Sequence, residues 1–198
     1  ENLLVNQFLK LGPNEYLKLG GGYMEFQYAG VTAEYLKTFQ QGRFAFGPEL
    51  TWAKKRDPDA VFGLQGSPIL TPFLNFYLYA PELNTTFSAK AGRFLGEDEG
   101  VRMQVTRDVR GGKVFLWYTK TDTSDFTGPN RDYSDKGVGF AIPVRVFKDS
   151  DRQGYYSMAL SPWSRDTGQS VYQPYSLFDF IKEFTPVYIQ DHWNEMTE

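Results

Sequence analysis

Apolar and polar side chains alternate along most of this chain, in about nine segments of about ten to twelve residues each. Each segment ends at a turn signal or a polar break. Alternation with a period of two predicts β-strands, and strands joined by short connections predict an antiparallel up-and-down meander. The predicted segments are Tyr16–Tyr28, Val31–Phe39, Arg43–Lys55, Ser67–Tyr79, Thr85–Leu95, Gly100–Val109, Lys113–Thr121, Asp135–Phe147 and Gly154–Trp163.

The length of these segments favours a particular kind of β-protein. A tilted strand needs about ten residues to cross the hydrocarbon layer of a bilayer, whereas strands of water-soluble proteins cluster near about five or six residues. We therefore predict an all-β fold of the outer-membrane β-barrel type, with about nine to ten strands. The chain would form a complete barrel or part of a larger one.

The two faces of a predicted strand differ in character. A one-residue slip would exchange these faces, so the pattern fixes which face meets an apolar phase. It does not say whether that phase is lipid or protein, and a soluble β-sandwich with an apolar interior remains the alternative. In segment Ser67–Tyr79 the apolar face comprises Leu70, Pro72, Leu74, Phe76 and Leu78, and the opposite face carries Thr71, Asn75, Tyr77 and Tyr79.

Turn residues and changes of pattern suggest how the chain is organised. Gly30 and the pair Gln41-Gly42 indicate tight turns, and Gly111-Gly112 indicates a two-residue hairpin. We expect a lead-in over residues 1–15, formed by a helical turn or an edge segment. The barrel domain would cover residues 16–175, and a tail with a short helix near Ser176–Phe184 would follow over residues 176–198.

Aromatic residues are abundant, at 17% of the chain. A membrane barrel uses aromatic side chains in girdles at both interfaces, and a sugar-binding protein uses them to stack on sugar rings. The chain has no run of about eighteen apolar residues, which excludes a transmembrane helix. We interpret the aromatics at strand ends as an interfacial belt: Tyr16, Trp52, Tyr79, Trp117, Tyr118 and Trp163.

Charge and composition exclude several classes of function. The net charge of −3 and the absence of a Lys/Arg run argue against a nucleic-acid partner. The chain has no cysteine and a single histidine, His192, which we expect to be solvated in a polar tail. Thiol chemistry, cysteine zinc sites and a Ser-His-Asp arrangement within the strands are therefore excluded. We predict no catalytic residue, no cofactor and no metal.

Carboxylates are the remaining candidates for chemistry. Glu25, Glu34 and Glu49 could supply the acid pair of a glycan hydrolase, although spacing along separate strands does not show which carboxylates converge. Calcium could bind near Asp57 and Asp59, or in a loop with Asp122, Asp125 and Asp132, but neither has an EF-hand pattern. We favour interior or loop charges that are solvated or paired with arginine.

Five stretches of the sequence, in order, resemble the C-terminal portion of the YjbH family. The resemblance covers most of Tyr16–Phe180. The stretches are EFQYAGVTAEYL from Glu25, ELTWAKKRDPDAVFGL from Glu49, AGRFLGEDEGVRMQVTRDVRGG from Ala91, DKGVGFAIP from Asp135 and LSPWSRDTGQ from Leu160.

The resemblance implies a location and a set of partners. YjbH proteins are outer-membrane β-barrels of Gram-negative bacteria, linked to exopolysaccharide and group 4 capsule production, and are generally much longer than this chain. The resemblance therefore implies that this chain is a piece of a barrel, a short relative of the family, or a subunit that completes its sheet with strands from elsewhere.

The implied function is a non-enzymatic component of polysaccharide secretion. Its partners would be outer-membrane lipid, a secreted polysaccharide and a periplasmic polysaccharide-export protein of the Wza type. The candidate contacts to the polysaccharide or the barrel interior are Glu25, Arg93, Arg107, Trp117, Arg165 and Asp166.

Overall fold

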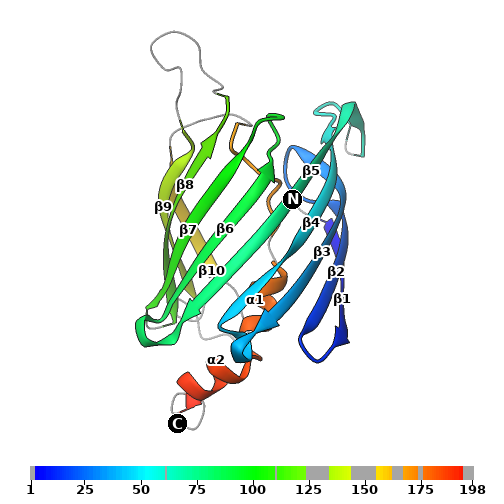
Figure 1. Cartoon of the computed structure of the whole chain (residues 1–198). Helices are drawn as coiled ribbons and strands as arrows, with labels where there is room; N and C mark the ends of the chain where they lie inside the picture. Colours follow the sequence, from blue (N-terminus) through cyan, green and yellow to red (C-terminus); the bar gives the residue numbers. More distant parts are fainter. Residues whose placement is uncertain are drawn as a thin grey trace.

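A single antiparallel sheet of ten strands dominates the chain (Figure 1). This computed structural model describes residues 3–60, 62–109, 111–123, 134–143, 155–161, 167–173 and 176–193. The strands are β1 (Leu3–Gly12), β2 (Glu15–Tyr23), β3 (Tyr28–Phe39), β4 (Phe44–Arg56), β5 (Leu64–Ala80), β6 (Thr85–Arg93), β7 (Glu99–Val109), β8 (Gly112–Thr121), β9 (Lys136–Pro143) and β10 (Tyr155–Leu160). The helical elements are η1 (Gln40–Gly42), η2 (Pro81–Leu83), α1 (Leu177–Lys182) and α2 (Pro186–Asp191).

The sheet is the predicted up-and-down meander. Each strand pairs with its neighbour in sequence, from β1 to β10, and every pairing is antiparallel. Among the described residues β1 and β10 are the two edges of the sheet. The lead-in is thus an edge strand and not a helical turn. The sandwich alternative is wrong for the described strands, because they form one curved sheet instead of two packed ones (Figure 1).

The apolar face of the sheet points outward. On β4 to β9, many of the side chains that alternate with the buried positions are large and apolar, and those named below are more than a third exposed. We call this surface the outer face. Its central members are Leu50, Leu70, Leu74, Phe76, Leu78, Phe87, Met103, Leu116, Val138 and Phe140.

The opposite, concave surface of the sheet carries most of the buried polar side chains. This inner face carries charged and hydroxyl side chains on β2 to β8, including Lys18, Thr32, Glu34, Glu49, Thr51, Thr71, Asn75 and Thr119. The distribution is the reverse of a water-soluble protein, in which apolar side chains are buried and charged ones are exposed.

The part of the chain after β10 covers part of the inner face. We call its described residues, 167–173 and 176–193, the C-terminal segment. In Figure 1 α1, in orange, lies inside the curve of the sheet, and α2 continues from it beyond the ends of the strands. Ser176 begins α1, because its hydroxyl accepts a hydrogen bond from the amide of Asp179 at 3.1 Å. Pro186 then starts α2 in the first turn, where a missing amide hydrogen costs nothing. The helix predicted near Ser176–Phe184 is therefore confirmed as α1, and α2 is a second short helix that the sequence pattern did not predict.

One predicted turn is wrong. Gly30 lies inside β3, opposite Ala53 of β4, and the connection from β2 to β3 is formed earlier, where the amides of Met24 and Glu25 donate to the carbonyl of Tyr28. A Cβ atom on Gly30 would lie 2.0 Å from the carbonyl oxygen of Trp52. Gly30 thus permits a close approach of neighbouring backbones instead of a turn.

The tight turn predicted at Gln41-Gly42 is confirmed, and the hairpin predicted at Gly111-Gly112 is confirmed at Gly111, whereas Gly112 already belongs to β8. At the first, Gly42 in η1 has φ of 104°, and a Cβ atom there would clash with the side chain of Thr185 at 2.4 Å. This contact brings α2 close to the turn between β3 and β4. At the second, β7 ends at Val109 and β8 begins at its partner Gly112, with Gly111 at φ of 79° between them.

The aromatic belt is only partly consistent with the structure. Trp52 and Tyr118 are exposed and lie on the outer face. Tyr16, Tyr79 and Trp117 instead point to the inner side, where Tyr79 and Trp117 are buried, so the belt prediction is wrong for these three. Trp163 lies outside the described residues. Within the part of the chain that the structure describes, no helix is long and apolar enough to cross a membrane.

Candidate functional site

The interior of the protein consists of a polar layer between two apolar clusters. One cluster joins Leu36 of β3 and Ala45 of β4 to α1 and α2, and the other joins Tyr28 of β3 and Ala53 of β4 to Val171. The polar layer occupies the strand positions between these clusters, where Thr32, Glu34, Glu49 and Thr51 are buried. Because an isolated buried charge is costly, each charge in this layer needs a partner.

A fully buried ion pair lies at the centre of the polar layer. Lys18 of β2 and Glu34 of β3 are directly opposed across the two strands, and their side chains are 1% and 2% exposed. The distance from Lys18 Nζ to Glu34 Oε2 is 2.9 Å. The same carboxylate oxygen accepts a hydrogen bond from the amide of Leu177 at 3.0 Å, which ties the first turn of α1 to the sheet.

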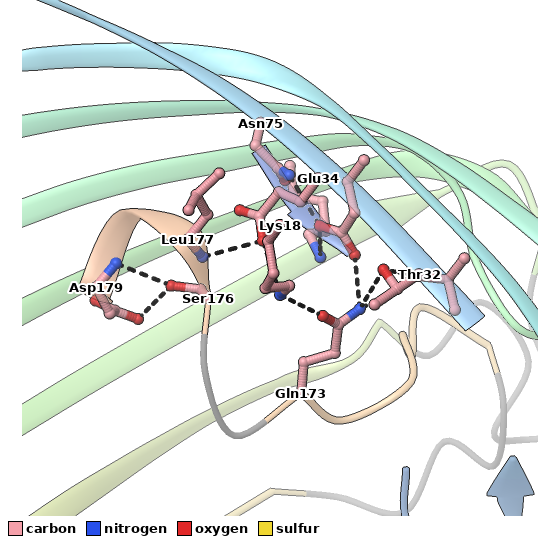
Figure 2. Close-up of polar contacts among 11 residues, drawn as sticks. Lys18, Thr32, Glu34, Asn75, Gln173, Ser176, Leu177 and Asp179 are labelled. Atoms are coloured by element: carbon pink, nitrogen blue, oxygen red, sulfur yellow. Dashed lines mark hydrogen bonds and ion pairs between the residues drawn. The ribbon is translucent and has the colours of Figure 1, made fainter. Parts of the chain in front are cut away.

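Gln173 links the C-terminal segment to the sheet, as Figure 2 shows. Its amide oxygen accepts a hydrogen bond from Lys18 Nζ at 2.6 Å. Its amide nitrogen donates to Thr32 Oγ1 at 3.1 Å, to Thr51 Oγ1 at 3.2 Å and to Glu49 Oε1 at 3.4 Å. One side chain thereby contacts three neighbouring strands, β2, β3 and β4.

A second carboxylate, Glu49, lies beside Glu34 on β4. Its Oε2 atom is 2.9 Å from Lys90 Nζ of β6 and accepts a hydrogen bond from Asn75 Nδ2 at 2.8 Å. Glu34 and Glu49 therefore lie side by side, which their spacing in the sequence did not show. Each is engaged by its own lysine.

Asp135 holds the far side of the inner face together. Its Oδ2 atom accepts hydrogen bonds from Arg102 Nη1 at 3.2 Å, Trp117 Nε1 at 2.9 Å and Thr119 Oγ1 at 3.2 Å. Its Oδ1 atom accepts a hydrogen bond from Gln169 Nε2 at 2.9 Å. This buried carboxylate joins β7, β8 and the C-terminal segment, and charge-assisted hydrogen bonds of this kind are the stronger ones.

A polar cavity of about 390 Å³ remains between the C-terminal segment and the inner face. Ser88, Lys90, Arg102 and Gln104 line it from β6 and β7, and Phe178 lines it from α1. This volume is within the range of about 300–1,000 Å³ that is usual for small-molecule sites. The inner face is thus partly filled and partly open to a ligand.

The structure disperses the residues predicted to contact a polysaccharide. Glu25 lines the cavity and accepts a hydrogen bond from the amide of Tyr172 at 3.2 Å. Trp117 is buried against Asp135. Arg93 lies at the end of β6 and pairs with Glu97 at 3.2 Å, and Arg107 is exposed near the end of β7.

Of the predicted contact residues, Glu25 alone is therefore at the cavity among those that the structure describes. Arg93 and Arg107 lie at opposite ends of the strands, which is the rim position that a barrel would require of an exposed arginine. Arg165 and Asp166 lie outside the described residues.

No group of three or more His, Cys, Asp and Glu side chains gathers as a metal site in the described ranges. Asp57 Oδ1 accepts a hydrogen bond from the amide of Asp59 at 3.0 Å, and Asp122 Oδ1 accepts one from the amide of Glu99 at 2.9 Å. Asp57 therefore closes a local turn, and Asp122 links the end of β8 to the start of β7. Asp125 and Asp132 lie outside the described residues. His192 is not simply solvated, because its ring stacks on Tyr188 at 4.0 Å.

Asp98, in the connection between β6 and β7, has a buried carboxyl group with only one of its oxygens engaged. Its Oδ2 atom accepts a hydrogen bond from the amide of Gly168 at 2.8 Å, and its Oδ1 atom has no partner. Burial raises the pKa of the Asp98 carboxyl above its ordinary value, which is near about 4. The folded state thus binds this proton more tightly than the unfolded state.

We expect the contribution of Asp98 to stability to be full below the ordinary pKa and to be lost as pH rises through the higher folded value. The Asp98→Asn variant should lack this loss, because asparagine carries no titrating proton and still accepts the hydrogen bond from Gly168. Urea unfolding in detergent at a series of pH values measures the effect. An unchanged pH slope in the variant would contradict the assignment.

Sequence reasoning did not identify Lys18 and Gln173 as site residues. A signal existed for Lys18, because it alternates with Leu17 and Leu19 of the outer face and must point to the other side. No comparable signal existed for Gln173. It lies in an irregular segment, where periodicity does not define a face.

Comparison with known proteins gives a family and a relative. The family model for "Exopolysaccharide biosynthesis protein YbjH" matches residues 1–183. The chain is 26% identical over 188 residues to the "Uncharacterized lipoprotein YjbH" of Escherichia coli (strain K12), a match that covers 92% of this chain and 27% of that protein. The chain therefore spans about a quarter of the length of the curated relative it matches. No solved structure matches it.

Proposed function

The chain belongs to the YjbH family of exopolysaccharide biosynthesis proteins, and from this premise we propose that it is a non-enzymatic, outer-membrane β-barrel component of exopolysaccharide or capsule secretion. Its strands would be part of a barrel in the outer membrane of a Gram-negative bacterium. Further strands would come from the same polypeptide or from another chain. The cargo would be the secreted polysaccharide, delivered by a periplasmic export protein of the Wza type.

One observation supports this proposal above the others: the outer face is apolar while the inner face carries buried ion pairs. Water-soluble monomers rarely expose contiguous apolar patches larger than a few hundred Å². A membrane-spanning barrel requires this arrangement, with an apolar band toward lipid and a polar interior. The name lipoprotein carried by the Escherichia coli relative also supports a location in the cell envelope.

The chemistry of the polar layer supports a non-enzymatic role. Glycan hydrolases need one carboxyl group that is free to protonate the leaving group and a second one to attack or to activate water. Here Glu34 and Glu49 are each held by a lysine at 2.9 Å. We propose that these carboxylates organise the interior and carry out no bond cleavage.

Lipid-dependent quenching of tryptophan fluorescence tests the proposed location. Trp52 is on the outer face and 42% exposed, whereas Trp117 is on the inner face and 8% exposed. In a Trp163→Phe/Trp193→Phe background, we expect brominated acyl chains to quench a large part of the emission. The added change Trp52→Phe should remove most of that quenching and leave the emission of Trp117.

The control is the same background in vesicles without bromine. The proposal fails if bromine does not quench Trp52, or if the chain folds as a monomer in plain buffer, because an outer face in contact with water needs no lipid.

A further inference from the structure

An apolar groove of about 450 Å³ crosses the outer face over β4 to β7. Ala89 of β6 lies at its floor, directly between its strand neighbours Phe76 of β5 and Met103 of β7. The methyl group of alanine leaves a gap between these two larger side chains. The outer-face side chains along the groove include Phe44, Phe46, Phe76, Phe87, Met103 and Val105.

Stacked aromatic rings form one wall of the groove. Phe46 stacks on Phe76 with ring centroids 6.2 Å apart, and Phe39 of β3 stacks on Phe46 at 5.4 Å. The outer-face side chains of the groove carry no strong hydrogen-bonding group. A hydrocarbon chain therefore suits this groove, and a polar ligand would lose its hydration there without compensation.

A positive charge lies next to one end of the groove. Arg107 alternates in the same sense as Met103 and Val105 of β7, so it belongs to the outer face, and it is exposed. Its strand neighbour on β6 is Thr85, two residues from Phe87, which is the neighbour of Val105. Arg107 is thus one side-chain position beyond the groove on the same face.

Among the described residues, no carboxylate pairs with Arg107. Its neighbours across the strands are the uncharged Thr85 and Val114. Two acids at this end of the sheet are engaged elsewhere: Asp108 Oδ2 by Lys182 at 2.8 Å and Glu82 Oε1 by Arg43 at 2.9 Å. The guanidinium group is therefore available to an external anion.

The height of Arg107 on the sheet matches that of a lipid head group. β7 ends two residues later at Val109, at the end of the sheet where α2 lies (Figure 1). On a lipid-facing surface an arginine costs least near the interface. A guanidinium group also forms paired, charge-assisted hydrogen bonds with phosphate oxygens.

We propose that the groove and Arg107 together bind one phospholipid, with its phosphate on Arg107 and one acyl chain along Ala89 toward the middle of the sheet. This inference rests on the proposed function, in which the outer face meets a bilayer. Charge complementarity selects the occupant, because a lipid without a phosphate would fill the groove and leave Arg107 without an anion.

Two lipids with the same acyl chains test the contribution of the phosphate. Dimyristoylphosphatidylglycerol carries the phosphate that dimyristoylglycerol lacks. For the full chain in a non-ionic detergent, we expect native mass spectrometry to show about tenfold tighter binding of the phosphatidylglycerol. Arg107→Gln should abolish this preference. Arg93→Gln is the matched control and should keep it, because Arg93 lies at the opposite end of the strands and is engaged by Glu97 at 3.2 Å.

A second pair of variants tests the groove itself. Ala89→Phe fills the groove and should weaken binding of both lipids. Ala91→Phe should change neither, because Ala91 is on the same face of β6 but outside the groove. The two variants add the same side chain to the same strand, so a difference between them reports on the groove and not on general stability.

Equal affinity for the two lipids, a preference that survives Arg107→Gln, or equal effects of Ala89→Phe and Ala91→Phe would overturn the proposal. Inorganic phosphate that binds as tightly as the phosphatidylglycerol would also overturn it, because the groove would then contribute nothing. Any of these results, with Trp52 still quenched by brominated lipid, would reject the lipid site and leave the proposed membrane role intact. Loss of that quenching as well would reject the proposed function.

Discussion

Replacing Lys18 by methionine lowers the free energy of unfolding by about 3–5 kcal/mol, the usual cost of breaking a buried ion pair from one side. The change leaves the carboxylate of Glu34 buried at 2% exposure without its cation. It also removes the hydrogen bond from Lys18 Nζ to Gln173. We expect the C-terminal segment to loosen together with the sheet. Urea unfolding in detergent, followed by circular dichroism, measures the loss.

The same two strands supply a matched control. Glu15 of β2 and Lys37 of β3 are also directly opposed and form an ion pair of 2.8 Å, but this pair is exposed and lies where β2 begins and β3 ends, at the rim of the sheet. Because water screens exposed pairs, Lys37→Met should change stability far less than Lys18→Met. The double variant Lys18→Met/Glu34→Met should recover much of the stability, since both charges leave the interior. Equal effects of Lys18→Met and Lys37→Met would contradict the buried-pair account.

Strand periodicity was sufficient to predict the meander and the two faces of β5. Alternation places Leu70, Leu74 and Phe76 on a common side of β5, and in the structure all three lie on the outer face. The pattern could not predict that this side is the exterior. Which face of the sheet is exposed depends on which face the rest of the chain covers. Here the C-terminal segment, which is remote in sequence from β5, covers the inner face.

Glycine was a weaker guide than alternation. Gly111 and Gly42 mark turns because each has a positive φ. Gly30 has no such conformation and serves a close contact with β4 instead. Both roles exclude a side chain, so the residue type alone does not distinguish them.

The sequence predicted which residue types would form the candidate site, but it did not predict which side chains would pair with one another. Glu34 and Glu49 are candidate carboxylates in the sequence, but their pairing with Lys18 and Lys90 depends on strand register and on the reach of lysine across neighbouring strands. Gln173, which joins three strands, was unpredictable because it lies on no periodic element. Long-range contacts made by irregular segments carry no local signature.

Replacing Leu74 by arginine destabilises the protein in lipid vesicles by about 2–4 kcal/mol, the cost of a basic side chain on the lipid face of a barrel near mid-depth. Leu74 is 40% exposed near the middle of β5 and has no partner that would neutralise a positive charge among its outer-face neighbours Pro48 and Ala91. Folding into vesicles over a urea series, followed by heat-modifiable mobility in gels, measures the change.

Leu83 is the control for this prediction, because it is 56% exposed but lies in η2, between the ends of β5 and β6. Surface substitutions in water usually change stability by less than about 0.5 kcal/mol, and we expect this of Leu83→Arg. If Leu74→Arg is equally mild, the outer face contacts water and the membrane proposal is wrong. A large effect at Leu74 alone would mean that two exposed leucines at different heights of the sheet have different surroundings. A bilayer provides such a difference, and a uniform aqueous solvent does not.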